Sequence, residues 1–156
     1  MNTFHDLFRF PTRKVDGNSP PDDRRGEFFS QLVERSRKLH LWSPGQPTSQ
    51  TGRRILIGIA TWSGYDLALL DLIEDAIHAP IRIDVFDTEV CRTPPDLERY
   101  IPGLDPGPQT PFVGLWENGQ LVEMAAGFPG RQLAARVCSL EWDDVTACMA
   151  AVHARP

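Results

Sequence analysis

Residues 55–86 read ILIGIATWSGYDLALLDLIEDAIHAPIRIDVF, and they predict a strand, a helix and a second strand. The first six residues are a continuous apolar run, which is typical of a strand buried on both faces. After a turn over 61–65, apolar residues recur at helical spacing from Asp66 until Pro80 ends the helix. Residues 81–86 alternate between apolar and polar side chains, as a strand does. This order predicts two parallel strands joined by a right-handed crossover.

The residues that follow predict a hairpin between helices. The pattern over 93–104 indicates a short helix, with Thr93 as its N-cap. Apolar runs at 111–117 and 120–126 flank Asn118-Gly119, the strongest short-range signal of a β-hairpin. Two more helical patterns follow, and the second predicts a C-terminal helical extension over 139–154.

The N-terminal part divides into an arm and a helix. Residues 1–27 are predicted to be a flexible arm, because 11–27 is rich in Pro, Asp, Arg and Gly and almost free of apolar residues. Apolar residues at helical spacing then predict an amphipathic helix over 28–42. With 156 residues in all, the chain suits one domain, which we expect to span 28–156.

Composition and charge exclude several classes of protein. Hydrophobic residues make up 41% and charged residues 24%, as in soluble globular proteins. Residues 1–56 carry ten Lys or Arg against six Asp or Glu, whereas residues 57–156 carry six against fifteen. The acidic second part argues against nucleic-acid binding, which needs clustered positive charge. No apolar stretch approaches the roughly 18 to 20 residues that span a bilayer, and no secretory signal is recognised, so a cytoplasmic protein without membrane contact is predicted.

Cysteine and histidine patterns indicate no metal or cofactor. Cys91, Cys138 and Cys148 are an odd number without Cys-x-x-Cys spacing, which fits a reducing compartment. No Cys-His cluster or His-x-x-x-His spacing predicts a metal site, and no Gly-rich motif predicts a phosphate site. Neither a cofactor nor a metal is therefore expected. No motif links a histidine to Ser63 as a catalytic base, so no catalytic residue is predicted.

The order of elements and three short motifs resemble the thioredoxin-like superfamily over roughly residues 54–138. The motifs are Thr110-Pro111-Phe112, Glu117-Asn118-Gly119 and Gly127. The resemblance implies an α/β, thioredoxin-like fold, in which a central mixed β-sheet is flanked by helices, with extra N-terminal and C-terminal helices. It also implies a cis peptide bond before Pro111.

The redox motif of that family is absent here. Where the family has Trp-Cys-Gly-Pro-Cys, this chain has Trp62-Ser63-Gly64-Tyr65-Asp66, and the acid that many thioredoxins bury falls near Ile57. Thiol–disulfide exchange requires a thiolate, which neither Ser63 nor Asp66 can supply. The chain thus looks like a degenerate member of the superfamily, and it is not expected to be a dithiol oxidoreductase.

Two interpretations of the altered motif remain open. Ser63 and Asp66, three residues apart before an apolar helix, are close to a capping box, which would stabilise the helix without any ligand. The alternative is a surface that binds a protein or peptide, because aromatic residues beside free backbone groups suit such recognition. Its predicted members are Trp62, Ser63, Tyr65, Asp66, Thr110 and Pro111.

The favoured functional hypothesis is a redox-inactive protein that binds another protein or peptide, as an assembly or maturation chaperone or as a regulatory subunit. The extra N-terminal and C-terminal helices could supply a dimer surface, so the hypothesis of a homo-oligomer stays open. The alternative is a thiol-dependent enzyme or transferase that uses Cys91 or the groove beside Pro111. A purely structural adaptor with no use for the groove is a third hypothesis.

Overall fold

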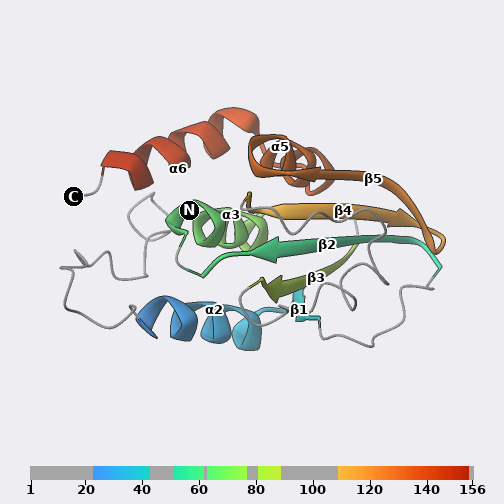
Figure 1. The fold of residues 1–156 in the computed structure, drawn as a ribbon, viewed down its shortest axis with the longest axis horizontal. Coiled ribbons are helices and arrows are strands. Elements are labelled where there is room, and N and C mark those ends of the chain that lie inside the picture. The colour runs from blue at the N-terminus through green and yellow to red at the C-terminus, as the bar shows by residue number, and fades with distance from the viewer. Residues whose placement is uncertain (1–22, 43–50, 62, 77–80, 89–108, 155–156) are drawn as a thin grey trace.

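The computed structural model describes residues 23–42, 51–61, 63–76, 81–88 and 109–154. Within them, five strands form one mixed sheet in the order β1-β3-β2-β4-β5 (Figure 1). β1, β3 and β2 are parallel, while β4 runs antiparallel to β2 and to β5. The strands are β1 (Leu39–Leu41), β2 (Arg53–Ile59), β3 (Arg82–Asp87), β4 (Phe112–Glu117) and β5 (Gln120–Ala126).

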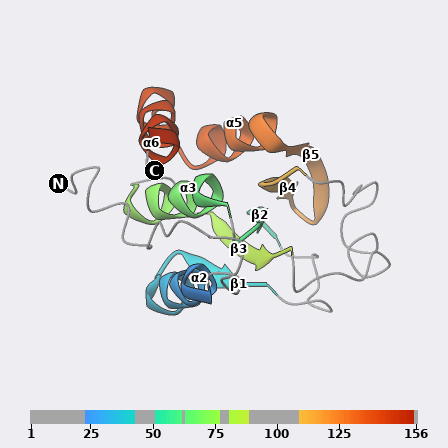
Figure 2. The ribbon, with the colours of Figure 1, turned by 60° about the vertical axis from the view of Figure 1, so that its left-hand side comes forward.

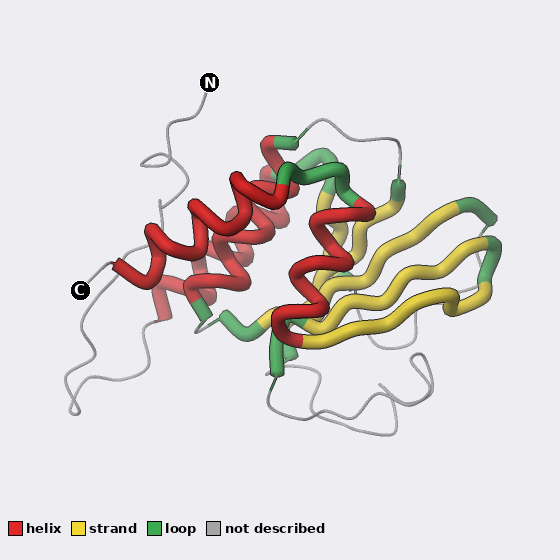
Figure 3. The backbone as a smooth tube through the Cα atoms, turned by 90° about the horizontal axis from the view of Figure 1, so that it is seen from above, coloured by secondary structure: helices red, strands yellow, loops and turns green. Residues whose placement is uncertain are grey.

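The described residues also form four helices, which lie on one face of the sheet (Figure 2). They share a single apolar core with the inward side chains of the strands, among them Ile57 of β2 and Val113 of β4, both fully buried. α6 packs against α3 (Figure 1 and Figure 2). Figure 3 shows the helices in red and the strands in yellow, seen from above. The helices are α2 (Asp23–Arg35), α3 (Gly64–Asp75), α5 (Gly127–Val137) and α6 (Trp142–Ala154).

The predicted fold class is confirmed: the chain is α/β, with a central mixed sheet flanked by helices, as in a thioredoxin-like fold. The strand, helix and strand over 55–86 form the predicted parallel pair, with Ile55 of β2 opposite Ile83 of β3. The Asn118-Gly119 hairpin also forms, and both of its turn residues have positive φ. The helix predicted over 93–104 lies outside the described residues.

The N-terminal helix differs from its predicted range of 28–42. α2 begins earlier, at Asp23, and ends at Arg35, while residues 39–41 form strand β1. Ser36 explains the break, because its hydroxyl accepts hydrogen bonds from the backbone N–H groups of Lys38 (3.0 Å) and Leu39 (2.7 Å). These bonds turn the chain away from the helix, so that it pairs with β3.

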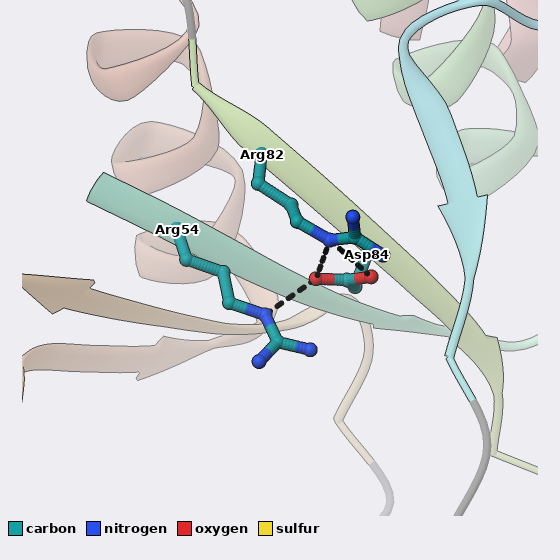
Figure 4. Close-up of polar contacts among 3 residues, drawn as sticks. All are labelled: Arg54, Arg82 and Asp84. Atoms are coloured by element: carbon teal, nitrogen blue, oxygen red, sulfur yellow. Dashed lines mark hydrogen bonds and ion pairs between the residues drawn. The ribbon is translucent and has the colours of Figure 1, made fainter. Parts of the chain in front are cut away.

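The other face of the sheet carries a smaller, aromatic core. Its buried members are Trp42, Leu56, Phe86, Phe112 and Trp116. Gly58 of β2 leaves room for the Phe86 ring, because a Cβ at position 58 would be 2.6 Å from that ring. The same face contains a buried ion pair between Arg54 and Asp84, to which Arg82 also binds (Figure 4).

No helix among the described residues is long and apolar enough to cross a lipid bilayer.

Candidate binding site at the first turn of helix α3

Local hydrogen bonds close the turn between β2 and α3. Ser63 is the N-cap of α3, with extended backbone angles of −88° and 111°, and its Oγ accepts from the backbone N–H of Asp66 at 3.4 Å. The Ser63 N–H in turn donates to the carbonyl of Ala60 at 2.9 Å. Ser63 and Asp66 are therefore hydrogen-bonded to each other, as the capping interpretation predicts.

Asp66 is a buried carboxyl group at this turn. Its side chain is fully buried, and Oδ2 accepts a hydrogen bond from the backbone N–H of Ala60 at 3.0 Å. Burial raises the pKa of Asp66 above its usual range, although the Ala60 hydrogen bond, the nearby Thr110 hydroxyl and the positive charge of Arg131 each oppose that rise. Among the described residues, none hydrogen-bonds Oδ1. The site therefore contains a carboxyl group that is more easily kept protonated than an exposed one.

The start of β4 lies beside this turn and is held by α5. The Thr110–Pro111 peptide bond is cis, and the Pro111 carbonyl accepts from the N–H of Gly127 at 3.0 Å. Gly130, one turn into α5, approaches so closely that a Cβ there would lie 2.5 Å from the Pro111 oxygen. Thr110 and Pro111 thus sit where β4, α3 and α5 meet.

Tyr65, in the first turn of α3, connects the site to both later helices. Its hydroxyl lies 3.1 Å from Nδ1 of His153 in the last turn of α6. The Arg131 guanidinium of α5 lies over the Tyr65 ring, 5.6 Å from its centroid, and 5.8 Å from that of Phe128. Phe128 is 53% exposed.

The structure thus brings together five of the six predicted site residues: Ser63, Tyr65, Asp66, Thr110 and Pro111. The sixth, Trp62, lies outside the described residues. Sequence reasoning missed Phe128, Arg131 and His153. No local pattern indicates them, because His153 is 88 positions from Tyr65 and reaches it only through the packing of α6 on α3.

The cysteines of the C-terminal helices lie in the core rather than at this site. Burial raises the pKa of Cys138 to about 12, and burial together with the negative charge of Asp71 raises that of Cys148 to about 12. Both thiols are free and fully buried. Cys91 lies outside the described residues. The part of the chain that the structure describes holds no group of His, Cys, Asp and Glu arranged for a metal ion.

No family model matches the chain, and no curated protein matches it. Among solved structures, form II of ERdj5 is similar, with a TM-score of 0.45 and 16% identity over 67% of this chain and 14% of that one. A chain in a structure concerned with the thiol resolving mechanism in yeast mitochondrial 1-Cys peroxiredoxin via glutathione/thioredoxin systems is also similar, with a TM-score of 0.37 and 19% identity over 60% of this chain and 83% of that one. The function of the site is therefore inferred from its own residues.

Proposed function

We propose that the chain is a redox-inactive, thioredoxin-fold protein that acts by binding a protein or peptide. We call the proposed binding region the α3 face: Tyr65 and Thr110 are partly exposed there, above the buried Ser63, Asp66 and Pro111. One observation carries the redox-inactive part of the proposal: the side chains at positions 63 and 66 are an oxygen-bearing cap and a buried carboxyl, both hydrogen-bonded to local backbone. Neither can form or break a disulfide.

The described thiols support the same conclusion. A nucleophilic cysteine needs a thiolate and solvent access, and Cys138 and Cys148 are buried with pKa values near 12. The alternative of a thiol-dependent enzyme then depends on Cys91 or on the groove beside Pro111. Among the described residues, no cysteine lies beside Pro111, because Cys138 and Cys148 are in the core.

The surface around the turn favours recognition of another chain. Phe128 is exposed and Tyr65 is partly exposed, and aromatic side chains contribute large contact areas at little entropic cost. Both are placed by helices packed on the core, so the surface is largely formed before a partner arrives.

The test is capture of partners from the native cell extract, read by mass spectrometry. A Trp62→Ala, Tyr65→Ala double variant is compared with wild type and with Leu41→Ala, a control at an exposed apolar side chain of β1. A protein captured by wild type and by Leu41→Ala, but lost by the double variant, supports the proposal. Equal capture by all three, or none by any, contradicts it.

Size-exclusion chromatography of the captured complex separates the two proposed roles. A regulatory subunit stays in a stable complex with its mature partner. An assembly or maturation chaperone binds the immature partner and is released from the finished one.

A further inference from the structure

Arg131 occupies an unusual position beside the α3 face. Its guanidinium lies over the ring of Tyr65 and over the ring of Phe128, with centroid distances of 5.6 and 5.8 Å. Phe128 also contacts Trp142 edge to face, at a centroid distance of 5.5 Å and an interplanar angle of 85°. We call Tyr65, Phe128, Arg131 and Trp142 the Arg131 cluster. Helices α3, α5 and α6 supply these residues, and two of the aromatic rings contact the guanidinium.

Arg131 differs from the other described arginines of the acidic part of the chain. Arg82 binds Asp84, and Arg136, on the same helix as Arg131, binds Glu123. Arg131 forms no hydrogen bond or ion pair with any residue that the structure describes. The five N–H donors of its guanidinium are therefore not used by these residues.

Negative groups near the cluster do not neutralise it. The carboxyl of Asp66 senses the charge of Arg131, but it is buried, and its Oδ2 is bonded to the backbone. Asp143 and Asp144 lie in the first turn of α6, beside Trp142, and neither pairs with Arg131. A positive charge thus remains available within a part of the chain that is acidic overall.

An arginine that stacks on aromatic rings keeps its planar fork in one orientation, and that fork matches a carboxylate with two parallel hydrogen bonds. Phe128, half-exposed next to it, offers an apolar contact to a neighbouring side chain. The ligand that fits both Arg131 and Phe128 is a peptide segment that carries a carboxylate next to an apolar side chain.

We propose that Arg131 binds an Asp or Glu side chain of the partner peptide, while Phe128 contacts an adjacent apolar residue. The occupant is thus an acidic peptide segment. The inference rests on the proposed binding function of the α3 face and adds the chemical class of the ligand.

The first step of the test is an array of immobilised ten-residue peptides with randomised sequences, probed with labelled full-length protein. Capture of peptides enriched in Asp or Glu next to an apolar residue supports the proposal. Capture without that enrichment overturns it and leaves the proposed function standing. Capture of no peptide above background overturns both.

The second step measures affinity by fluorescence polarisation for the strongest peptide and for its Glu→Gln or Asp→Asn form. Wild type should bind the acidic form at least about fivefold more tightly, as expected of a partly solvent-screened arginine–carboxylate pair. Arg131→Met should remove that preference, and Arg131→Lys should restore part of it. Arg136→Met, on the same helix, is the matched control and should keep the preference. A preference that survives Arg131→Met overturns the proposal.

Discussion

Arg54 of β2 donates from Nε to Oδ2 of Asp84 on the neighbouring strand β3, at 2.5 Å. Side-chain exposures are 6% for Arg54 and 0% for Asp84, so the pair is buried. Arg82 adds a second contact, from Nε to Oδ1 at 3.3 Å, and both arginines point at the same carboxylate (Figure 4). Removing water from such charges is costly, and their mutual attraction offsets that cost only while both partners are present.

Replacing Asp84 should therefore destabilise the fold strongly. Asp84→Ala removes the buried carboxylate to which both Arg54 and Arg82 bind, and we expect the free energy of unfolding to fall by about 3 to 5 kcal/mol. Urea denaturation followed by circular dichroism measures it.

The neighbouring residue Arg53 provides the matched control. Its ion pair with Glu117, at 3.4 Å, is about half exposed on both sides. Glu117→Ala should cost at most about 1 kcal/mol. If Asp84→Ala and Glu117→Ala lowered the free energy of unfolding by similar amounts, burial would not be what makes the Asp84 ion pair important.

The stability of the protein should depend on pH through Asp66. Because burial raises its folded pKa, the contribution of this group to stability is fully present below its unfolded pKa of about 3.9 and is lost as pH rises through the folded pKa. Asp66→Asn stays neutral, so its stability relative to wild type should increase from pH 4 to pH 8. Urea unfolding across this range tests the prediction, and a difference between the two proteins that does not change with pH would sink it.

Ser63→Ala should remove the N-cap of α3 without abolishing the fold. The Oγ contact to the Asp66 N–H is long, at 3.4 Å, so the expected loss is about 1 kcal/mol or slightly less. Ser63→Asp should restore most of it, because a carboxylate also caps a helix and favours its positive end. A thermal melt that places Ser63→Ala at or above wild type would show that the hydroxyl does not stabilise the helix.

Cys138 and Cys148 should resist alkylation in the folded protein. With pKa values of about 12, fewer than about one thiol in 10⁴ is ionised at pH 7.5, and burial blocks the reagent as well. Iodoacetamide labelling followed by peptide mapping should show both sites unmodified until urea is added. The same map reports on Cys91 separately, and its rapid labelling would support the thiol-dependent alternative.

Gly130→Ala should disturb the position of Pro111. The added methyl group would lie 2.5 Å from the Pro111 oxygen and 3.2 Å from that of Ala125, both of which are backbone atoms. Overpacking of this kind costs about 1 to 3 kcal/mol. Gln132→Ala, at an exposed position of the same helix, should change the unfolding free energy by less than about 0.5 kcal/mol. Equal stabilities of the two variants would contradict the close approach of α5 to β4.

Periodicity and turn chemistry predicted the main elements from sequence alone. The apolar run at 55–60 and the alternation at 81–86 correspond to β2 and β3, with bounds that differ by one or two residues, and Asn118-Gly119 forms the hairpin. These signals are local, since each depends on side chains a few positions apart. β1 was missed because its three residues continue the apolar spacing of α2, and only pairing with β3 shows them to be a strand.

The surroundings of the candidate site could be predicted only in part. The capping role of Ser63 and Asp66 could be predicted, because a helix cap is recognised from residues three positions apart. The burial of Asp66, the stacking of Arg131 on Tyr65 and the approach of His153 depend on how three helices pack, and distant contacts of this kind leave no local pattern. The ion pair of Arg54 and Asp84 was missed for the same reason, because single charged residues in apolar strands do not reveal their partners.

The hydrogen bond that closes the turn at Ser63 has one further consequence. A turn built on a serine hydroxyl and a carboxyl has a single covalent state, whereas a pair of cysteines at the same two positions would have two. The covalent structure of this turn thus does not depend on the reduction potential of its surroundings. Under the proposed binding function, a partner would meet the same turn in oxidising and reducing conditions alike.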